Sequence, residues 1–280
     1  MDWFGQTRGV TDFLQLNDAP VEFVEPELLR ATSYGHFTSM QVRSGRVRGL
    51  DLHLERLDHS SLELFGQGVP ADRALSYLRL ALDRADSADL SIRVNAFTRE
   101  RAKLDAGIPV SPELLITVTD PLDPTPDPPR LLAVEHERVV PHLKHTGTFP
   151  LVYFGRQAHL AGYDDALFHN RAGNVSEASI WNICFAGRDG IVWPEAEVLP
   201  GITMLTLQAG LAATGVRSAT VPVPLTDLAS YDAAYLTNSI DPALPVASIT
   251  TPAGTTEYRT DPASTALIAA AFEAVPPQQI

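Results

Sequence analysis

The chain has 280 residues and 21 basic side chains, of which only Lys103 and Lys144 are lysines. Chemistry that needs a primary amine therefore has two candidates. Lys144 lies in VVPHLKHTGTF, after an apolar strand-like segment and before a predicted helix, where a domain interior could receive its amine. Partial burial favours the neutral amine that a Schiff-base nucleophile requires. The alternative is a solvated loop lysine, since most lysines are exposed and a codon bias toward arginine also explains their scarcity.

A second candidate is Glu177, in NVSEASIWNICF, at the start of a predicted apolar strand where a carboxylate has no packing role. A buried carboxylate needs a cationic or hydrogen-donating partner, and a protonated pyridine nitrogen would be one. The alternative is a turn-flanking glutamate in water.

Three separate stretches could bind a phosphate. LPGIT (199–203) precedes a predicted helix, whose first backbone N–H groups and positive dipole end attract anions, and Thr203 adds a hydroxyl. Arg56 in HLERL and the cluster Thr237-Asn238-Ser239 offer a guanidinium and further hydroxyls. The alternative for LPGIT is an ordinary capped helix. The alternative for Arg56 and for residues 237–239 is exposed surface side chains that bind no ligand.

Other chemistries have little support in the sequence. His136, His142 and His145 have no HExxH or carboxylate spacing, so we expect no metal site. Cys184 lies between apolar neighbours and is expected to be inert core. Hydrolase elbow, P-loop and Rossmann motifs are missing from the sequence.

The composition narrows the class of partner and the compartment. A formal charge of −13 disfavours binding to the negatively charged phosphates of nucleic acid, so nucleic acid is not an expected partner. No stretch approaches the roughly 18 apolar residues of a membrane span, and the first 20 residues do not resemble a secretory signal. A single cysteine fits the cytosol best.

The stretch DPLDPTPDPP (120–129) carries five prolines in ten residues and predicts a semi-rigid linker. It separates a small α+β domain (1–119) from a larger domain (131–280), with 120–130 as the linker. In the first domain we expect a hairpin around Ser44-Gly45, helices at 50–64 and 71–85, and strands at 90–98 and 114–119, which form a small sandwich of sheet and helices.

The second domain is expected to contain strands and flanking helices in turn. Its predicted strands are 131–137, three within 166–192 (ALFHN, SIWNICF and IVW), 235–236 and 246–249. Its predicted helices are 149–161, closed by Gly162, then one from LPGIT to about Thr214 with Gly215 in the C′ position, and 264–274.

Taken in order, these pieces resemble the class IV aminotransferases, fold-type-IV pyridoxal phosphate enzymes that include D-amino-acid and branched-chain aminotransferases and aminodeoxychorismate lyases. The resemblance spans about Tyr34 to Ile249 and rests on motifs in a fixed order. These motifs are YGHFTSMQV, HLERL, LKHTGTF, AGYDDALFHNRAGNVSEASIWNICF, LPGIT and LTNSIDPALPV.

The resemblance implies a two-domain enzyme whose larger domain has a β-barrel-like sheet core with flanking helices. It also implies that Lys144 holds the cofactor as an internal aldimine and moves the Cα proton, and that Glu177 pairs with the pyridinium nitrogen. Substrate would bind between the domains of a homodimer, with the second subunit completing the pocket. The implied phosphate ligands are Arg56, the backbone N–H groups of Ile202 and Thr203, the Thr203 hydroxyl, and Ser239.

Departures from the family pattern bear on the substrate. The usual Y-G-D-G-x-F-E stretch is here Tyr34-Gly35-His36-Phe37-Thr38, one residue shorter and without the acid. Phe37 matches a tyrosine that helps trap the substrate carboxylate in D-amino-acid aminotransferases, so we expect Arg99 or Arg101 to supply a compensating guanidinium.

The expected function is a transaminase that moves an amino group between an amino acid, of D-type with a broad pocket, and a 2-oxo acid by a ping-pong mechanism. A lyase that eliminates pyruvate from aminodeoxychorismate is an alternative, because the Lys144-His145 pair also occurs in some of those enzymes. A branched-chain or amine transaminase is another; Phe149 stands where branched-chain enzymes carry a tyrosine, which disfavours that subgroup. The last alternative is a pyridoxal phosphate-binding protein without turnover.

Overall fold

The computed structural model describes residues 13–20, 33–124, 127–259 and 261–280. Within these, the chain divides into two compact units. The first contains the described residues up to Asp123 together with Leu143–Gly147 and Pro277–Ile280, and the second contains Pro124–His142 and Thr148–Pro276. Two short segments that we expected in the larger domain thus group with the first unit, because each pairs with one of its strands.

The first unit is an antiparallel sheet in the order β2-β1-β6-β5-β3. Its strands are β1 (Phe13–Leu16), β2 (Ala19–Pro20), β3 (His36–Val42), β5 (Leu90–Phe97) and β6 (Glu113–Thr119). The short strand β4 (Arg46–Val47) pairs with β17 (Gln278–Gln279) near the end of the chain. Ser44 and Gly45, both at positive φ, form the tight turn after β3 that the sequence predicted. The strand after this turn, β4, pairs with β17 and not along β3.

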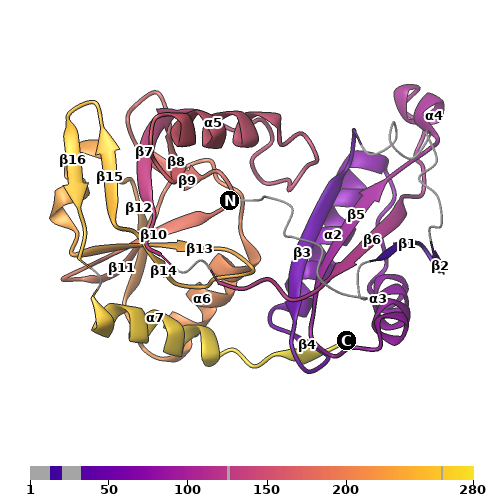
Figure 1. Cartoon of the computed structure of the whole chain (residues 1–280). Helices are drawn as coiled ribbons and strands as arrows, with labels where there is room; N and C mark the ends of the chain where they lie inside the picture. Colours follow the sequence, from indigo (N-terminus) through magenta and orange to yellow (C-terminus); the bar gives the residue numbers. More distant parts are fainter. Residues whose placement is uncertain (1–12, 21–32, 125–126, 260) are drawn as a thin grey trace. The chain divides into compact units, whose positions relative to one another are not determined.

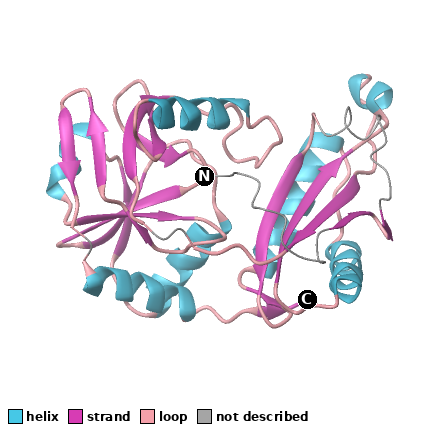
Figure 2. Cartoon of the chain, viewed as in Figure 1, coloured by secondary structure: helices cyan, strands magenta, loops and turns pink. Residues whose placement is uncertain are grey.

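Two helices cover one face of this sheet (Figures 1 and 2). They are α2 (Leu50–Phe65), which ends at Gly66 with φ 72°, and α3 (Ala71–Ala85); a short helix α4 (Arg101–Asp105) follows β5. Alternate residues of β3 and β5 point into a core with these helices, among them Met40, Val42, Ile92 and Val94. Because successive strand residues face opposite sides, the residues between them form a second, more polar face.

The second unit is built on a ten-stranded sheet in the order β12-β11-β10-β9-β8-β7-β15-β16, with β13 paired to β10 and β14 to β13. Its first strands are β7 (Arg130–Glu135), β8 (Asp165–His169), β9 (Val175–Ala178), β10 (Asn182–Gly187) and β11 (Gly190–Pro194). The others are β12 (Ser218–Val221), β13 (Ala233–Thr237), β14 (Leu244–Pro245), β15 (Ser248–Thr251) and β16 (Gly254–Glu257).

Helices flank these strands as expected. Helix α5 (Phe149–Leu160) packs on β7 and β8, while α6 (Ile202–Ala213) and α7 (Pro262–Glu273) pack together on the other side of the strands, as Figure 1 shows. A 3₁₀ turn, η1 (Leu225–Ser230), precedes β13. Gly162 and Gly215 follow α5 and α6 with φ 87° and 71°, in the left-handed conformation that ends a helix.

Several strand predictions were wrong. The expected strand at 246–249 begins only at Ser248, where β15 starts, and β12 and β16 were not predicted. We expected three strands between residues 166 and 192, and the structure has four, because Val175–Ala178 forms β9 and the residues after it turn back. Ala178 N–H donates to the carbonyl of Trp181 at 2.9 Å, so Ser179–Trp181 is a tight turn and not the beginning of a strand. Glu177 consequently lies within a central strand of the sheet.

A buried carboxyl group fixes this turn to β8. The Ser179 hydroxyl donates to Asp165 Oδ2 at 2.8 Å, and Ala166 N–H donates to Oδ1 at 2.7 Å. Burial nevertheless raises the pKa of Asp165 to about 6, because the ionised form loses more hydration than these two donors replace.

Asp165→Asn should stabilise the protein at pH 8. A carboxyl group whose pKa is higher in the folded than in the unfolded chain favours folding below about pH 4, and this contribution disappears as the pH rises through about 6. The advantage of the amide should therefore reach about 2–3 kcal/mol at pH 8 and shrink toward pH 4, measured by urea unfolding across this range. Asp164→Asn, at an exposed neighbour paired with Arg130, is the control. A less stable Asp165→Asn variant at pH 8 would contradict this account.

Candidate active site

Lys144 lies on a short segment that extends the sheet of the first unit. Residues Leu143–Gly147 run antiparallel to β3, with a bridge between His36 and His145. Phe37 N–H donates to the Lys144 carbonyl and Thr146 N–H donates to the Gly35 carbonyl, both at 2.9 Å. A side chain at position 35 would not fit, since its Cβ would stand 2.2 Å from the Ala96 carbonyl oxygen. The main chain of Lys144 is therefore fixed to the edge strand β3.

The register of this pairing places Lys144 directly opposite Phe37. Lys144 Nζ lies 4.9 Å from the centroid of the Phe37 ring, which is itself buried. Arg93, from the neighbouring strand β5, places its guanidinium carbon 3.6 Å from the same centroid and donates through Nε to Asn95 at 2.9 Å. Two cationic side chains thus contact one aromatic ring, an arrangement in which the ring's electron-rich face attracts both.

Two buried histidines lie between the opposite face of β3 and α2, His36 on the strand and His53 on the helix. His36 Nε2 lies 2.8 Å from the Ser61 hydroxyl, and Thr38 Oγ1, at the position where the family motif has an acid, lies 2.5 Å from His53 Nδ1. Burial and the nearby charge of Arg56 lower the pKa of His36 to about 4. Burial, with the charges of Arg56 and Lys144, lowers the pKa of His53 to about 3. Both rings are therefore neutral at physiological pH.

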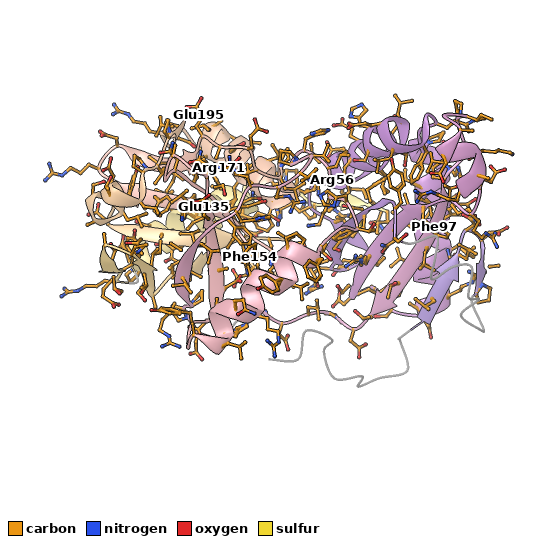
Figure 3. All side chains as sticks on the ribbon, turned by 90° about the horizontal axis from the view of Figure 1, so that it is seen from above. Arg56, Phe97, Glu135, Phe154, Arg171 and Glu195 are labelled. Carbon is orange, nitrogen blue, oxygen red and sulfur yellow. The ribbon has the colours of Figure 1, made fainter. Side chains whose placement is uncertain are left out.

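Arg56 lies on α2, one turn after His53, and is labelled in Figure 3. Its side chain is half-buried. Leu54 and Leu57 of α2 belong to the core while Arg56 does not, so the helix that packs on β3 also presents a guanidinium.

In the second unit, Glu177 is buried beside a cation that the sequence analysis did not single out. Arg138 Nε lies 3.4 Å from Glu177 Oε1, and their side chains are 8% and 6% exposed. Removing one member of such a buried pair costs about 3–5 kcal/mol, because the other charge is left without its partner. The pair favours the ionised form of Glu177, which is the form that could accept a hydrogen bond from a protonated ring nitrogen.

Glu177 is also connected to the LPGIT stretch. Leu199 N–H donates to Glu177 Oε2 at 3.2 Å, and the Asn182 side chain donates through Nδ2 to the Leu199 carbonyl at 2.8 Å. Asn182 pairs with Glu177 across β9 and β10. A Cβ at Gly201 would lie 2.0 Å from Asn182 Oδ1, so only glycine permits this approach. These contacts fix the start of α6 next to the buried carboxylate.

The N-terminus of α6 is suited to bind an anion. Helix α6 begins at Ile202 after Gly201, and no side chain caps it. The first backbone N–H groups of a helix have no partner within the helix, and the positive end of its dipole adds attraction for a negative group. Ile202 and Thr203 are both buried here.

Two further hydroxyl groups lie at the end of β13. Thr237 pairs with Asn182 across β10 and β13, and its buried Oγ1 has no hydrogen-bond partner among the described residues. Ser239 follows in a turn in which Asn238 Oδ1 accepts from the N–H groups of Ile240 and Asp241. A buried hydroxyl without a partner costs about 1–3 kcal/mol, so a polar ligand at this place would be favourable.

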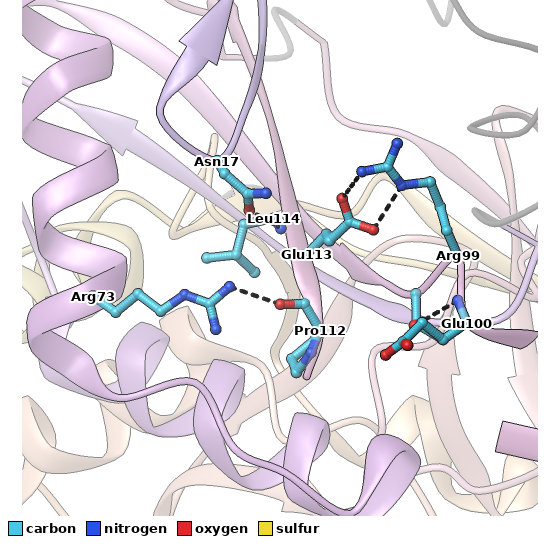
Figure 4. Close-up of polar contacts among 8 residues, drawn as sticks. Asn17, Arg73, Arg99, Glu100, Pro112, Glu113 and Leu114 are labelled. Atoms are coloured by element: carbon cyan, nitrogen blue, oxygen red, sulfur yellow. Dashed lines mark hydrogen bonds and ion pairs between the residues drawn. The ribbon is translucent and has the colours of Figure 1, made fainter. Parts of the chain in front are cut away.

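Arg99 and Arg101 lie after β5, where the sequence predicted them, and both are exposed. Arg99 donates to both carboxylate oxygens of Glu113, at 2.8 and 2.5 Å, as Figure 4 shows. Arg101 donates to Asp105 at 2.7 Å. Either could bind a substrate carboxylate only by giving up its present acidic partner, so their expected role stays a prediction.

Arg93 lacks such a partner: among the described residues, no carboxylate forms an ion pair with it. Strand alternation in LSIRVNAF already places Arg93 on the same face as Ser91 and Asn95, so the sequence held a signal that we missed. The second missed residue, Arg138, lies six positions before Lys144, in a loop where spacing gives no such signal.

Three other observations concern side chains and helices away from these groups. In the described part of the chain, no group of three or more His, Cys, Asp or Glu side chains could hold a metal ion. Cys184 is buried in β10, and burial raises the pKa of its thiol, so it is core and inert as predicted. None of the described helices is both long and apolar enough to cross a membrane.

The residues of the second unit fit the pyridine and phosphate groups of a pyridoxal phosphate molecule. The ring nitrogen requires a buried, ion-paired carboxylate, and a phosphate dianion requires donors such as the uncapped start of α6 and the Thr237 hydroxyl, which has no hydrogen-bond partner in the described part of the chain. Within this unit the structure brings Glu177 to Leu199, the first residue of LPGIT. Within the first unit it brings Lys144 to Phe37.

Several solved structures with the same fold are branched-chain aminotransferases. The enzyme from Thermoproteus uzoniensis with norvaline is 21% identical, with 93% of each chain covered and a TM-score of 0.77. The enzyme from Escherichia coli is 18% identical, with 95% of this chain and 94% of that chain covered and a TM-score of 0.77. The enzyme from Thermobaculum terrenum in its PLP form is 17% identical, with 94% and 93% covered and a TM-score of 0.76. They establish the fold-type-IV architecture of this chain.

Comparison of the sequence with curated proteins gives no match. The sequence pattern of the family described as amino-transferase class IV, however, matches residues 35–249, which include β3, Lys144, Glu177, LPGIT and the turn after β13. On that match, which covers most of the chain, the protein belongs to the class IV aminotransferases.

Proposed function

We propose that the protein is a pyridoxal phosphate-dependent transaminase that moves an amino group between a D-type amino acid and a 2-oxo acid. The observation that carries this proposal is the buried Glu177, in a chain that belongs to the class IV aminotransferases. Glu177 is paired with Arg138 and accepts a hydrogen bond from Leu199 N–H, just before the start of α6. Relatives of the same fold bind this cofactor, as the PLP form of the Thermobaculum terrenum enzyme shows for that protein.

Each proposed cofactor ligand has a role that its chemistry supports. Lys144 would bind the cofactor covalently through its amine, and Glu177 would accept a hydrogen bond from the protonated ring nitrogen. The proposed phosphate ligands are Arg56, the N–H groups of Ile202 and Thr203, the Thr203 hydroxyl and Ser239.

When bound, pyridoxal phosphate supplies a carbonyl that takes up the amino group and a ring that withdraws electrons from the substrate Cα. Lys144 would remove the proton from the substrate Cα and donate it to C4′ of the cofactor, because an amine released from the cofactor is a base of suitable strength. Glu177, held ionised by Arg138, would keep the ring nitrogen protonated while this happens. An amino donor would leave as a 2-oxo acid before the acceptor binds.

Substrate binding is proposed on the polar face of the first unit's sheet. Phe37 would contact the substrate, and a guanidinium would bind its carboxylate. Arg99 and Arg101 remain candidates, and Arg93 joins them because it has no acidic partner among the described residues. D-type selectivity rests on the resemblance of the motifs and on Phe149, which has no hydroxyl and stacks on Tyr153 at 5.9 Å between ring centroids.

A second candidate is a lyase that releases pyruvate from aminodeoxychorismate, with the same cofactor and lysine. The specific observation in its favour is His145, adjacent to Lys144 and bridged to His36 in the strand pairing. For either enzyme we propose a homodimer in the cytosol, which the family resemblance and the single buried cysteine support.

The donor assay separates these functions. The holoenzyme mixed with D-alanine alone should lose the visible absorbance of the lysine-bound cofactor and gain that of pyridoxamine phosphate, with one pyruvate released per site. L-alanine and a branched-chain amino acid are the matched comparisons. Conversion by a branched-chain amino acid but not by D-alanine would overturn the D-type assignment. Release of pyruvate from aminodeoxychorismate without any cofactor conversion would favour the lyase. If no donor gives conversion or turnover, the remaining function is a pyridoxal phosphate-binding protein without catalysis.

Glu177→Gln should retain the cofactor but slow the removal of the Cα proton by about 10- to 100-fold, since an amide does not hold a proton on the ring nitrogen. Stopped-flow absorbance with the best donor measures this step. Glu135→Gln, at an exposed carboxylate of β7 whose nearest cation is Arg171 at 3.9 Å (both labelled in Figure 3), is the matched control. An unchanged rate in Glu177→Gln would contradict the proposed role.

A further inference from the structure

Lys144 and Arg93 share the ring of Phe37, and this arrangement has an electrostatic consequence. The distances of 4.9 Å and 3.6 Å are measured to one centroid, so the two positive groups lie within about 10 Å of each other, roughly one screening length at 0.1 M salt. All three residues belong to the first unit, and strand pairing fixes their backbones. The proximity is therefore a property of the sheet.

Among the described residues, no acid forms an ion pair with Arg93 that would reduce this repulsion. The only polar contact of Arg93 in the described part of the chain is with the Asn95 amide oxygen, which carries no charge. Near the Lys144 segment the structure also places His36 from β3, His53 and Arg56 from α2, and His145 from the segment itself, and none of these four side chains is an acid.

We propose that Arg93 controls the charge of Lys144: while Arg93 has no anionic partner it favours the neutral amine, and a carboxylate bound at Arg93 allows Lys144 to take up a proton. This inference rests on the proposed role of Lys144 and adds a regulatory part to it. The neutral amine is the form that attacks a carbonyl and removes a proton. Arg93 would act as a positioning residue, and arrival of a substrate carboxylate would be coupled to proton uptake at the lysine.

The chain offers a direct test because it has only two lysines. Trace acetylation of the full chain, freed of cofactor, followed by peptide mapping gives the ratio of modification at Lys144 to that at Lys103, an exposed lysine on α4 that serves as the internal reference. Arg93→Met should lower this ratio at pH 7 by about tenfold, since loss of one charge at this distance changes the protonation free energy by about 1–2 kcal/mol in a medium of effective dielectric constant near 20. Arg93→Lys should restore most of it.

The matched control is Arg73→Met, which removes another guanidinium beside an aromatic ring, 5.8 Å from the centroid of Tyr77. It should leave the ratio unchanged. A carboxylate that cannot react with amines, propionate, should lower the wild-type ratio relative to chloride at equal ionic strength and should have no effect in Arg93→Met.

An unchanged ratio in a folded Arg93→Met protein, an equal fall in Arg73→Met, or no effect of propionate on the wild type would each overturn the proposal. Circular dichroism and a melting curve establish that each variant is folded. Labelling requires no turnover, so a failure here is distinguishable from a failure of the transaminase proposal, which the donor assay reports.

Discussion

The pairing of Leu143–Gly147 with the edge of β3 is the constraint on which the proposed chemistry depends. It fixes the main chain around Lys144 through two hydrogen bonds of 2.9 Å, from Phe37 N–H to the Lys144 carbonyl and from Thr146 N–H to the Gly35 carbonyl. An edge strand has unpaired backbone groups that can accept a further strand. Here that strand carries the candidate nucleophile, and the register places it opposite an aromatic ring and diagonal to Arg93. The amine therefore stands in an environment that the first unit's sheet determines.

The second unit is organised around a different constraint, a buried charge that needs partners. Glu177 lies in a central strand, where desolvation would otherwise drive it to take up a proton. Arg138 forms an ion pair with one carboxylate oxygen, and Leu199 N–H donates a hydrogen bond to the other. The same contacts connect the carboxylate to the turn that begins α6, and Gly201 permits that turn to approach Asn182. The proposed sites for a ring nitrogen and for a phosphate are thus connected by hydrogen bonds through Leu199 and Asn182.

The sequence predicted most helices closely, because their apolar spacing and terminal glycines are local signals. Helix α3 has the predicted bounds, and α2 and α5 differ from prediction by one residue at one end. The strand β9 was missed because two of its four residues, Ser176 and Glu177, are polar, and the sequence does not reveal that they are buried in a central strand. Long-range pairing was also beyond local signals: neither the addition of 143–147 to β3 nor that of β17 to β4 can be read from spacing. Arg138 was missed for the same reason, since its partner is 39 positions away.

The central claim, that Lys144 carries the cofactor, is tested most directly by chemical trapping. The holoenzyme, reduced with borohydride and digested, should yield a single pyridoxyl-modified peptide containing Lys144 in VVPHLKHTGTF. The chain supplies its own control, because Lys103 is the only other lysine and lies on an exposed helix of the first unit. Modification at Lys144 alone is the predicted result. A pyridoxyl group on Lys103, or on neither lysine in a protein that contains bound cofactor, would contradict it.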